Sequence, residues 1–259
     1  RKMTTQSKQV METEAMHVLQ VYKRIPVMFV RGVGSHLFDE EGQDYLDLLS
    51  GIGVASLGHA HAGLADAVAA QARELLHTSN LYFHPLQATV ASRLSRLSGL
   101  DRAFFCNSGT EAVETCLKFA RRYWYTRGET DRHEIVAFVG AFHGRTFGSL
   151  SVTSGGPYRT PFAPLLPGVR FVSPTDPQQA VEAVTDRTAA VIVEPIQGEG
   201  GVRPIPDETA KALTDACKST GTLIIADEVQ CGLGRTGQPF YSAVVGLKPD
   251  LMALGKSLG

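Results

Sequence analysis

The feature that most constrains the fold is an apolar run at residues 223–226, which ends abruptly in two carboxylates, Asp227 and Glu228. Such a run with polar residues at both ends is typical of a strand buried on both faces of a mostly parallel sheet. Asp227 is then predicted to lie at the carboxyl end of the strand, where open α/β sheets place their ligands. There it pairs with a metal, an arginine or a protonated ring nitrogen, or it only caps the next turn; this stretch leaves these alternatives open.

From about residue 61 the chain alternates between helix-like and strand-like stretches, which predicts an α/β fold with a mixed, mostly parallel sheet covered by helices. The predicted helices are 62–76, 85–97, 111–126, 177–184 and 207–220. The predicted strands are 103–106, 135–139, 169–172, 189–193, 223–226 and 251–254. Residues 144–167 carry four prolines, and a loop of that length is expected to line a site.

The N-terminal stretch has a different character. Residues 8–23 are predicted to form a helix, and 27–31, 35–39 and 45–49 are predicted to form short strands. The glycine-rich passage at 50–59 then marks a boundary, so the expected domains are 1–60 and 61–259.

Composition excludes several classes of function. The 259 residues are 43% hydrophobic and 20% charged, with a net charge of -1, so neither nucleic acid nor an anionic membrane is an expected partner. The four cysteines and eight histidines show no zinc-site spacing, and no metal is expected. With no signal-peptide core at the start and no disulfide-dense pattern, a reduced, cytoplasmic setting is expected.

Residues 107–111, Asn-Ser-Gly-Thr-Glu, join a predicted strand to a predicted helix. Ser108 and Glu111 have the spacing of a capping box, so the simplest interpretation is a well-capped helix. The alternative adds a phosphate, because a helix N-terminus offers free N–H groups, Gly109 allows close approach, and the Ser108 and Thr110 hydroxyls are further donors.

Two other strand ends carry polar or aromatic residues. Phe142 is either a core residue or a stacking face for a planar ring, and Arg145 is either a surface charge or a fork for a substrate carboxylate. His143 is equally open between polar packing and catalysis. Glu199, in the loop after the strand 189–193, is either a solvated carboxylate or the acceptor of a cation.

Lys256 follows the last apolar run and lies between Gly255 and Ser257. A lysine that leaves a buried strand loses hydration, which lowers its pKa and makes it a nucleophile towards carbonyls; the alternative is an ordinary surface lysine. Taken together, the lysine, Asp227, Phe142 and the helix terminus suit one ligand, pyridoxal phosphate, which has an aldehyde, a ring nitrogen, a planar ring and a phosphate.

The sequence resembles a known family, the class III (fold type I) pyridoxal-phosphate-dependent aminotransferases. The resemblance extends from residue 27 onward and rests on six motifs in the family's order. They are residues 76–82, 107–112, 142–146, 194–201, 226–237 and 249–259.

The resemblance implies a role for each matching residue. Lys256 would be the Schiff-base lysine and proton shuttle, Asp227 would pair with the pyridinium nitrogen, and Arg145 would bind the substrate α-carboxylate. The full expected cofactor-binding set is Ser108, Gly109, Thr110, Phe142, Asp227, Glu228, Val229, Gln230 and Lys256, and the substrate-binding set is Arg145 and Glu199.

The Phe-His-Gly-Arg spelling at 142–145 favours N-acetylornithine as amino donor and 2-oxoglutarate as acceptor, as in arginine biosynthesis. Other ω-amino donors, an aminomutase reaction and a silent fragment are the alternatives. The resemblance also implies a homodimer, with residues 1–60 in a small domain and 61–259 in an incomplete large domain. Family members continue beyond the lysine into a C-terminal domain with a second substrate-binding arginine, whereas this sequence stops three residues after Lys256.

Overall fold

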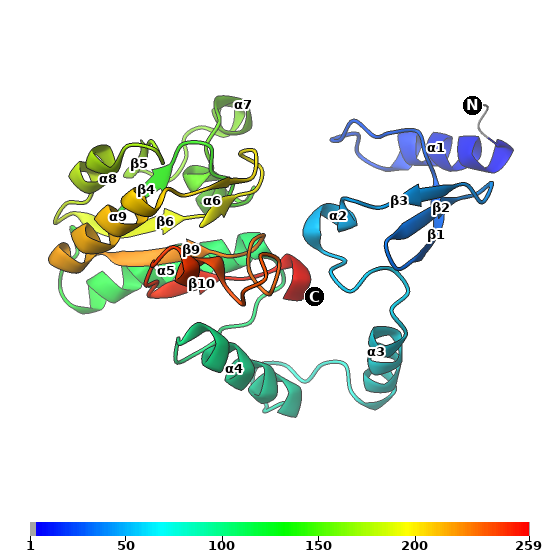
Figure 1. Cartoon of the computed structure of the whole chain (residues 1–259), viewed down its shortest axis with the longest axis horizontal. Helices are drawn as coiled ribbons and strands as arrows, with labels where there is room; N and C mark the ends of the chain where they lie inside the picture. Colours follow the sequence, from blue (N-terminus) through cyan, green and yellow to red (C-terminus); the bar gives the residue numbers. More distant parts are fainter. Residues whose placement is uncertain (1–3, 259) are drawn as a thin grey trace. The chain divides into compact units, whose positions relative to one another are not determined.

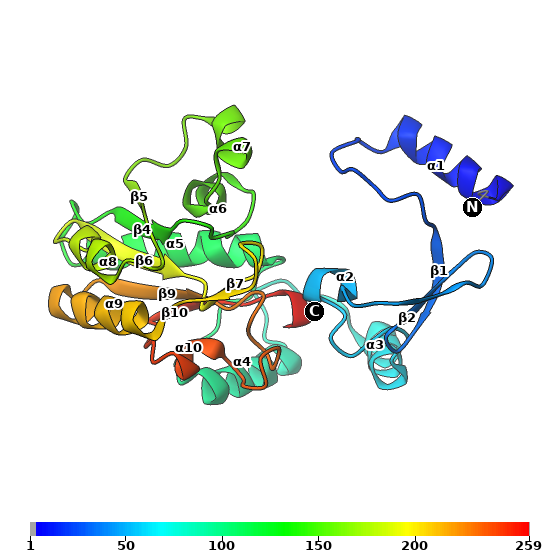
Figure 2. The same cartoon turned by 45° about the horizontal axis from the view of Figure 1, so that its top comes forward.

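The computed structural model describes residues 4–258, and the chain forms two compact units with a boundary between Leu81 and Tyr82. We call residues 1–81 the N-terminal unit and residues 82–259 the C-terminal unit (Figures 1 and 2). No described helix is long and apolar enough to cross a bilayer. The predicted domain division after residue 60 stays a prediction.

The N-terminal unit pairs helices with a small antiparallel sheet of order β1-β2-β3 (Figure 1). Its elements are α1 (Thr5–His17), β1 (Phe29–Val33), β2 (His36–Asp39), β3 (Asp44–Leu46), α2 (Ser50–Gly53) and α3 (Ala62–Glu74). The predicted helix 8–23 was displaced: α1 begins earlier because the Thr4 side chain accepts the Ser7 N–H, and it ends at His17 because Val18 is extended. The three short strands form as predicted, with shifted ends.

The C-terminal unit is built on a five-stranded parallel sheet of order β10-β9-β6-β4-β5. The strands are β4 (Glu134–Phe138), β5 (Val169–Val172), β6 (Thr188–Val193), β9 (Leu223–Asp227) and β10 (Leu251–Ala253). This confirms the predicted α/β fold. Every residue of β6 and β9 is buried, as expected of central strands with helices on both faces.

The two faces of the sheet have separate cores. Val191 and Ile224 pack on one face with residues of α8 (Pro177–Ala183) and α9 (Asp207–Thr220). Ile192 and Ile225 pack on the other face with α5 (Gly109–Thr126). Each fully buried aliphatic side chain contributes about 1.5–3 kcal/mol relative to exposure, so alternation along these strands fixes the helices on their faces.

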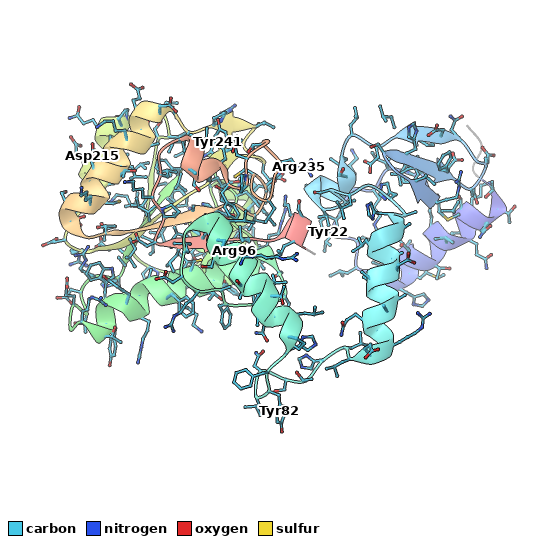
Figure 3. All side chains as sticks on the ribbon, turned by 60° about the horizontal axis from the view of Figure 1, so that its bottom comes forward. Tyr22, Tyr82, Arg96, Asp215, Arg235 and Tyr241 are labelled. Atoms are coloured by element: carbon cyan, nitrogen blue, oxygen red, sulfur yellow. The ribbon has the colours of Figure 1, made fainter. Side chains whose placement is uncertain are left out.

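The opposite sides of the covering helices carry charge. Asp215, labelled in Figure 3, lies on the exposed part of α9 and accepts a hydrogen bond from Lys211 at 2.8 Å. An exposed pair of this kind adds little stability, so α9 is held mainly by its buried face.

The remaining elements connect the sheet. They are α4 (Pro85–Ser98), α6 (Phe147–Val152), α7 (Gly156–Arg159), η1 (Thr160–Phe162), β7 (Ile196–Gln197), β8 (Arg203–Pro204), α10 (Tyr241–Val244) and η2 (Lys256–Leu258). The predicted loop 144–167 therefore contains helical turns. The predicted strand 103–106 was wrong, because none of the described strands pairs with it; Phe104 is 61% exposed and packs edge-on against Phe119.

Candidate active site

Apart from Ser108, Gly109 and Thr110 at the start of α5, the predicted site residues lie at or after the carboxyl ends of four parallel strands, β4, β6, β9 and β10. Parallel strands end at the same edge of a sheet, so their loops converge. Several contacts show this convergence: His143 Nδ1 lies 2.7 Å from Asp227 Oδ2, and Phe142 N lies 2.8 Å from Glu194 Oε2.

Asp227 is only 4% exposed and both of its carboxylate oxygens have partners. Oδ1 accepts the N–H of Val229 at 3.1 Å, so Asp227 does cap the next turn. Oδ2 accepts a hydrogen bond from His143 Nδ1 at 2.7 Å. The sequence did not predict this pairing, because 84 positions separate the two residues and neither motif alone names a partner.

His143 is 3% exposed, and its Nε2 has no hydrogen-bond partner among residues 4–258. With the Nδ1 proton donated to Asp227, the Nε2 lone pair faces no donor among the residues that the structure describes. A buried polar atom without a partner is uncommon and costs stability. His143 is thus hydrogen-bonded to Asp227 through Nδ1, whereas its Nε2 is left without a partner among the described residues.

Glu194, at the end of β6, is a third titratable group of this cluster and is also buried. Burial raises the pKa of its carboxyl to about 7, and the charge of Asp227 adds to the rise. His143 and the backbone N–H of Phe142 act in the opposite direction. The group therefore binds and releases a proton near neutral pH beside Asp227.

Glu194 leads to a stability prediction. Because its pKa is raised above the ordinary 4.5 to about 7, the folded chain holds a proton that the unfolded chain has lost across that window, and the free energy of unfolding falls as pH rises. Glu194→Gln should flatten this fall between pH 5 and 7.5, measured by denaturant titration. Glu182→Gln on the exposed face of α8 is the matched control; equal pH slopes for E194Q and the wild type would contradict the prediction.

Glu228 is 1% exposed, and its carboxylate points into its own loop. It accepts the N–H of Ser242 at 2.6 Å and lies 3.0 Å from the Cys231 Sγ. Burial and the Glu228 charge raise the pKa of the Cys231 thiol. The role of Glu228 visible in these contacts is to fix residues 228–242, one turn away from Asp227.

The start of α5 is capped by Ser108 as predicted, although the returning bond from Glu111 reaches Asn107, one residue before the N-cap, rather than Ser108 itself. Ser108 Oγ accepts the N–H of Glu111 at 3.3 Å, and Glu111 Oε2 accepts the N–H of Asn107 at 2.6 Å. Gly109 lies where two other segments meet: a Cβ there would lie 2.8 Å from Val229 Cγ1, and a Cβ on Gly255 would lie 3.2 Å from the Gly109 Cα. The helix terminus, the turn after β9 and the segment before Lys256 are therefore in contact.

Lys256 is partly buried in the turn after β10. Burial lowers the pKa of its ammonium, while Glu199, Asp227 and Glu194 act to raise it. The lowered pKa matches the prediction of a more nucleophilic lysine. Of the three carboxylates that influence Lys256, Glu194 and Glu199 follow β6 and Asp227 ends β9, which places Glu199 on the same side of the sheet.

Arg145 is exposed and lies beside two aromatic rings. Its guanidinium carbon is 5.8 Å from the centre of the Phe142 ring and 4.8 Å from that of Tyr158. Such stacking orients a guanidinium and leaves its N–H groups for an acceptor. Tyr158 was not predicted, because it lies in α7, inside the presumed loop.

Gln230 lies against the loop after β6, since a Cβ on Gly198 would collide with the Gln230 side chain. Two cavities between α4 and residues 233–252 contain none of these candidate residues. The candidate site is therefore the open sheet edge lined by the β4, β6, β9 and β10 loops.

Known proteins are similar to this chain in both sequence and fold. The family model for class-III aminotransferases matches residues 18–259. The chain is 45% identical over 248 residues to an acetylornithine aminotransferase of Methanocaldococcus jannaschii, covering 96% of this chain and 62% of that protein. It is 46% identical over 256 residues to a mitochondrial acetylornithine aminotransferase of Alnus glutinosa, with 97% and 57% covered.

Among solved structures, the ornithine aminotransferase of Toxoplasma gondii superposes with a TM-score of 0.92 at 31% identity, over 98% of this chain and 61% of that one. An aminotransferase of Bacillus anthracis gives 0.93 at 27%, over 100% and 63%. The chain spans about 60% of the length of these relatives. The match covers most of the chain, and we conclude that the chain belongs to the class-III aminotransferases.

Proposed function

We propose that this chain forms the pyridoxal-phosphate-binding part of a transaminase that moves the terminal amino group of N-acetylornithine to 2-oxoglutarate. Class-III aminotransferases use pyridoxal phosphate. The observation that carries the proposal is the position of a buried carboxylate, Asp227, at the sheet edge together with a partly buried lysine of lowered pKa, Lys256. Relatives at about 45% identity that bear the acetylornithine name support this donor.

The residues present fit the cofactor. Gly109 and Gly255 allow the α5 terminus, the turn after β9 and the segment before Lys256 to pack closely, because a Cβ on either glycine would lie within 3.2 Å of a neighbouring segment. A helix N-terminus with free N–H groups suits a phosphate. Ser108 and Thr110 flank Gly109, and Phe142 and Val229 would face the ring. Asp227 would face the ring nitrogen, with its charge fixed by His143.

When bound, pyridoxal phosphate supplies an aldehyde that condenses with amines and a ring that accepts electrons from the bond broken at carbon. Lys256 would hold the aldehyde and then move the proton, and its lowered pKa increases the neutral, basic fraction of its amine. The buried carboxylate of Asp227 would stabilise positive charge on the ring nitrogen that it faces. The hydrogen bond from His143 Nδ1 keeps that carboxylate oriented.

The substrate carboxylate would bind to Arg145, whose guanidinium is oriented by the Phe142 and Tyr158 rings. Glu199, in the loop after β6, and Gln230 complete the proposed set of binding residues. Acceptance of N-acetylornithine over other ω-amino donors is supported by the Phe-His-Gly-Arg sequence at 142–145 and by the names of the relatives.

Arg145→Ala should raise the KM for the amino donor by roughly tenfold to a hundredfold, because a charged hydrogen bond to the carboxylate is lost. Arg145→Lys should recover only part of the loss, since an ammonium lacks the planar fork. Arg170→Ala, an exposed arginine of β5, is the control. The KM and kcat are obtained from glutamate formation at varied donor concentration, and an unchanged KM in R145A would remove Arg145 from the binding set.

The proposal as a whole is tested by substrate profiling. The chain, and the longer protein of which it would be a part, are loaded with pyridoxal phosphate and given N-acetylornithine and 2-oxoglutarate. Formation of glutamate, with little from 4-aminobutyrate, is the expected result. Turnover of 4-aminobutyrate but not N-acetylornithine would overturn the donor, and reaction without any oxo acid would indicate an aminomutase.

The proposed assembly is a homodimer, as the family resemblance implies. The proposed setting is the cytoplasm, with no nucleic-acid or membrane partner, on the composition of the chain. The same separation by size that measures the oligomeric state also reports whether this chain forms dimers without the remainder found in its relatives.

A further inference from the structure

Glu114, on the first turns of α5, is a carboxylate that neither the motifs nor the proposed chemistry uses. Its Oε1 accepts three hydrogen bonds from one segment: from the Thr146 hydroxyl at 2.5 Å, from the Gly148 N–H at 2.8 Å and from the Ser149 N–H at 3.0 Å. Those two N–H groups belong to the first turn of α6, and the N–H groups of a first turn have no acceptor within their own helix. Glu114 thus caps α6 from another helix.

A group of hydroxyls connects this contact to the N-terminus of α5, the proposed phosphate site. Thr110 Oγ1 lies 2.6 Å from Ser149 Oγ and 3.0 Å from Thr146 Oγ1. Thr110 is the residue next to Gly109 at the α5 terminus, so its hydroxyl is held by the same turn that Glu114 caps.

The segments around this group are closely packed. Gly144 has a φ of +128°, and a Cβ there would collide with the hydroxyls of Thr110 and Ser149. A Cβ on Gly148 would collide with the Glu114 carboxylate. Arg145 therefore lies between Gly144, which packs against the Thr110 and Ser149 hydroxyls, and Thr146, whose hydroxyl donates to Glu114.

We propose that Glu114 is a positioning residue, which through the turn at residues 146–149 sets where Arg145 presents its guanidinium and where Thr110 presents its hydroxyl. This inference rests on the proposed function for the role of Arg145. It adds a physical link between the proposed phosphate site at the α5 terminus and the proposed substrate-carboxylate site at Arg145: the carboxylate of Glu114 holds the turn that contacts both.

The first test needs neither cofactor nor substrate. Amide hydrogen exchange at Gly148 and Ser149 is followed by NMR in the wild type, E114A and E114Q. E114A should exchange these two amides roughly tenfold to a hundredfold faster, because their charged acceptor is gone, while amides of β6 stay protected. E114Q should stay within about threefold of the wild type, since its carbonyl oxygen still accepts.

The second test uses kinetics of the loaded enzyme. E114A should raise the donor KM about tenfold with little change in kcat, and E114A combined with R145A should cost less than the two single changes together, because both act on one contact. A purely structural role would lower the active fraction and kcat at constant KM. Glu208→Ala, an exposed first-turn glutamate of α9, is the control and should change neither.

The outcomes separate the two proposals. Unchanged exchange at Gly148 and Ser149 in E114A would overturn the positioning role, whatever the activity. Fast exchange in E114A with fully additive effects of E114A and R145A would overturn the link to Arg145. Fast exchange of the two amides in E114A, together with no transamination of any donor by the wild type, would refute the proposed function and leave the capping of α6 by Glu114 established.

Discussion

Replacement of Lys256 by alanine is expected to abolish covalent attachment of pyridoxal phosphate. The wild-type chain, mixed with the cofactor and reduced with borohydride, should gain on the peptide that contains Lys256 the mass of one cofactor, less the water lost on condensation and plus two hydrogens from the reduction. The reason is that the Lys256 amine, of lowered pKa, condenses with the aldehyde. Lys256→Ala should show no labelled peptide and a loss of transamination of at least about a thousandfold.

Lys248→Ala is the matched control, since Lys248 is an exposed lysine just before β10, the strand that precedes Lys256. It should label at Lys256 as the wild type does. Borohydride labelling at Lys248 or at scattered lysines, with Lys256 unmodified, would contradict the assignment. Because the readout is mass, it applies to this chain whether or not it turns over substrate.

The second large effect is expected at Asp227. Asp227→Asn keeps the size of the side chain but removes the buried charge that faces the proposed ring nitrogen, so turnover should fall roughly a hundredfold to a thousandfold. The loss should appear in kcat rather than in donor KM, because Asp227 stabilises charge that develops during reaction. Glutamate formation and cofactor-binding fluorescence are measured in parallel.

The control for this change is Asp215→Asn on the exposed face of α9, which alters the net charge equally and lies outside the site. Thermal unfolding without cofactor distinguishes catalysis from folding, since D227N also replaces one of the two carboxylate oxygens that accept from His143 Nδ1 and the Val229 N–H by an NH2 donor. Turnover of D227N within about threefold of the wild type would remove Asp227 from the chemistry.

Periodicity and strand-end chemistry were enough to predict the parallel sheet, the capped start of α5 and the position of Asp227 at the carboxyl edge. These features depend on local sequence: an apolar run specifies β9, and the Ser108–Glu111 spacing specifies the cap. The resemblance to a family then supplied proposed roles that spacing alone left open.

Contacts between distant residues were not predictable in this way. The Asp227–His143 pair, the proton-binding Glu194 and the Glu114 cap depend on which loops meet, and nothing in the local pattern of any of them names its partner. The wrong strand at 103–106 has the same origin, because a β-prone segment becomes a strand only when a neighbour pairs with it.

The parallel register of β9 and β10 aligns Ala253 with Asp227, and the Glu228 N–H donates to the Ala253 carbonyl at 3.0 Å. From that fixed point only Leu254 and Gly255 lead to Lys256. One inserted residue would displace the amine by up to about 3.5 Å, so the spacer cannot change in length. Deletions or insertions between β10 and the lysine should therefore be selected against in active relatives.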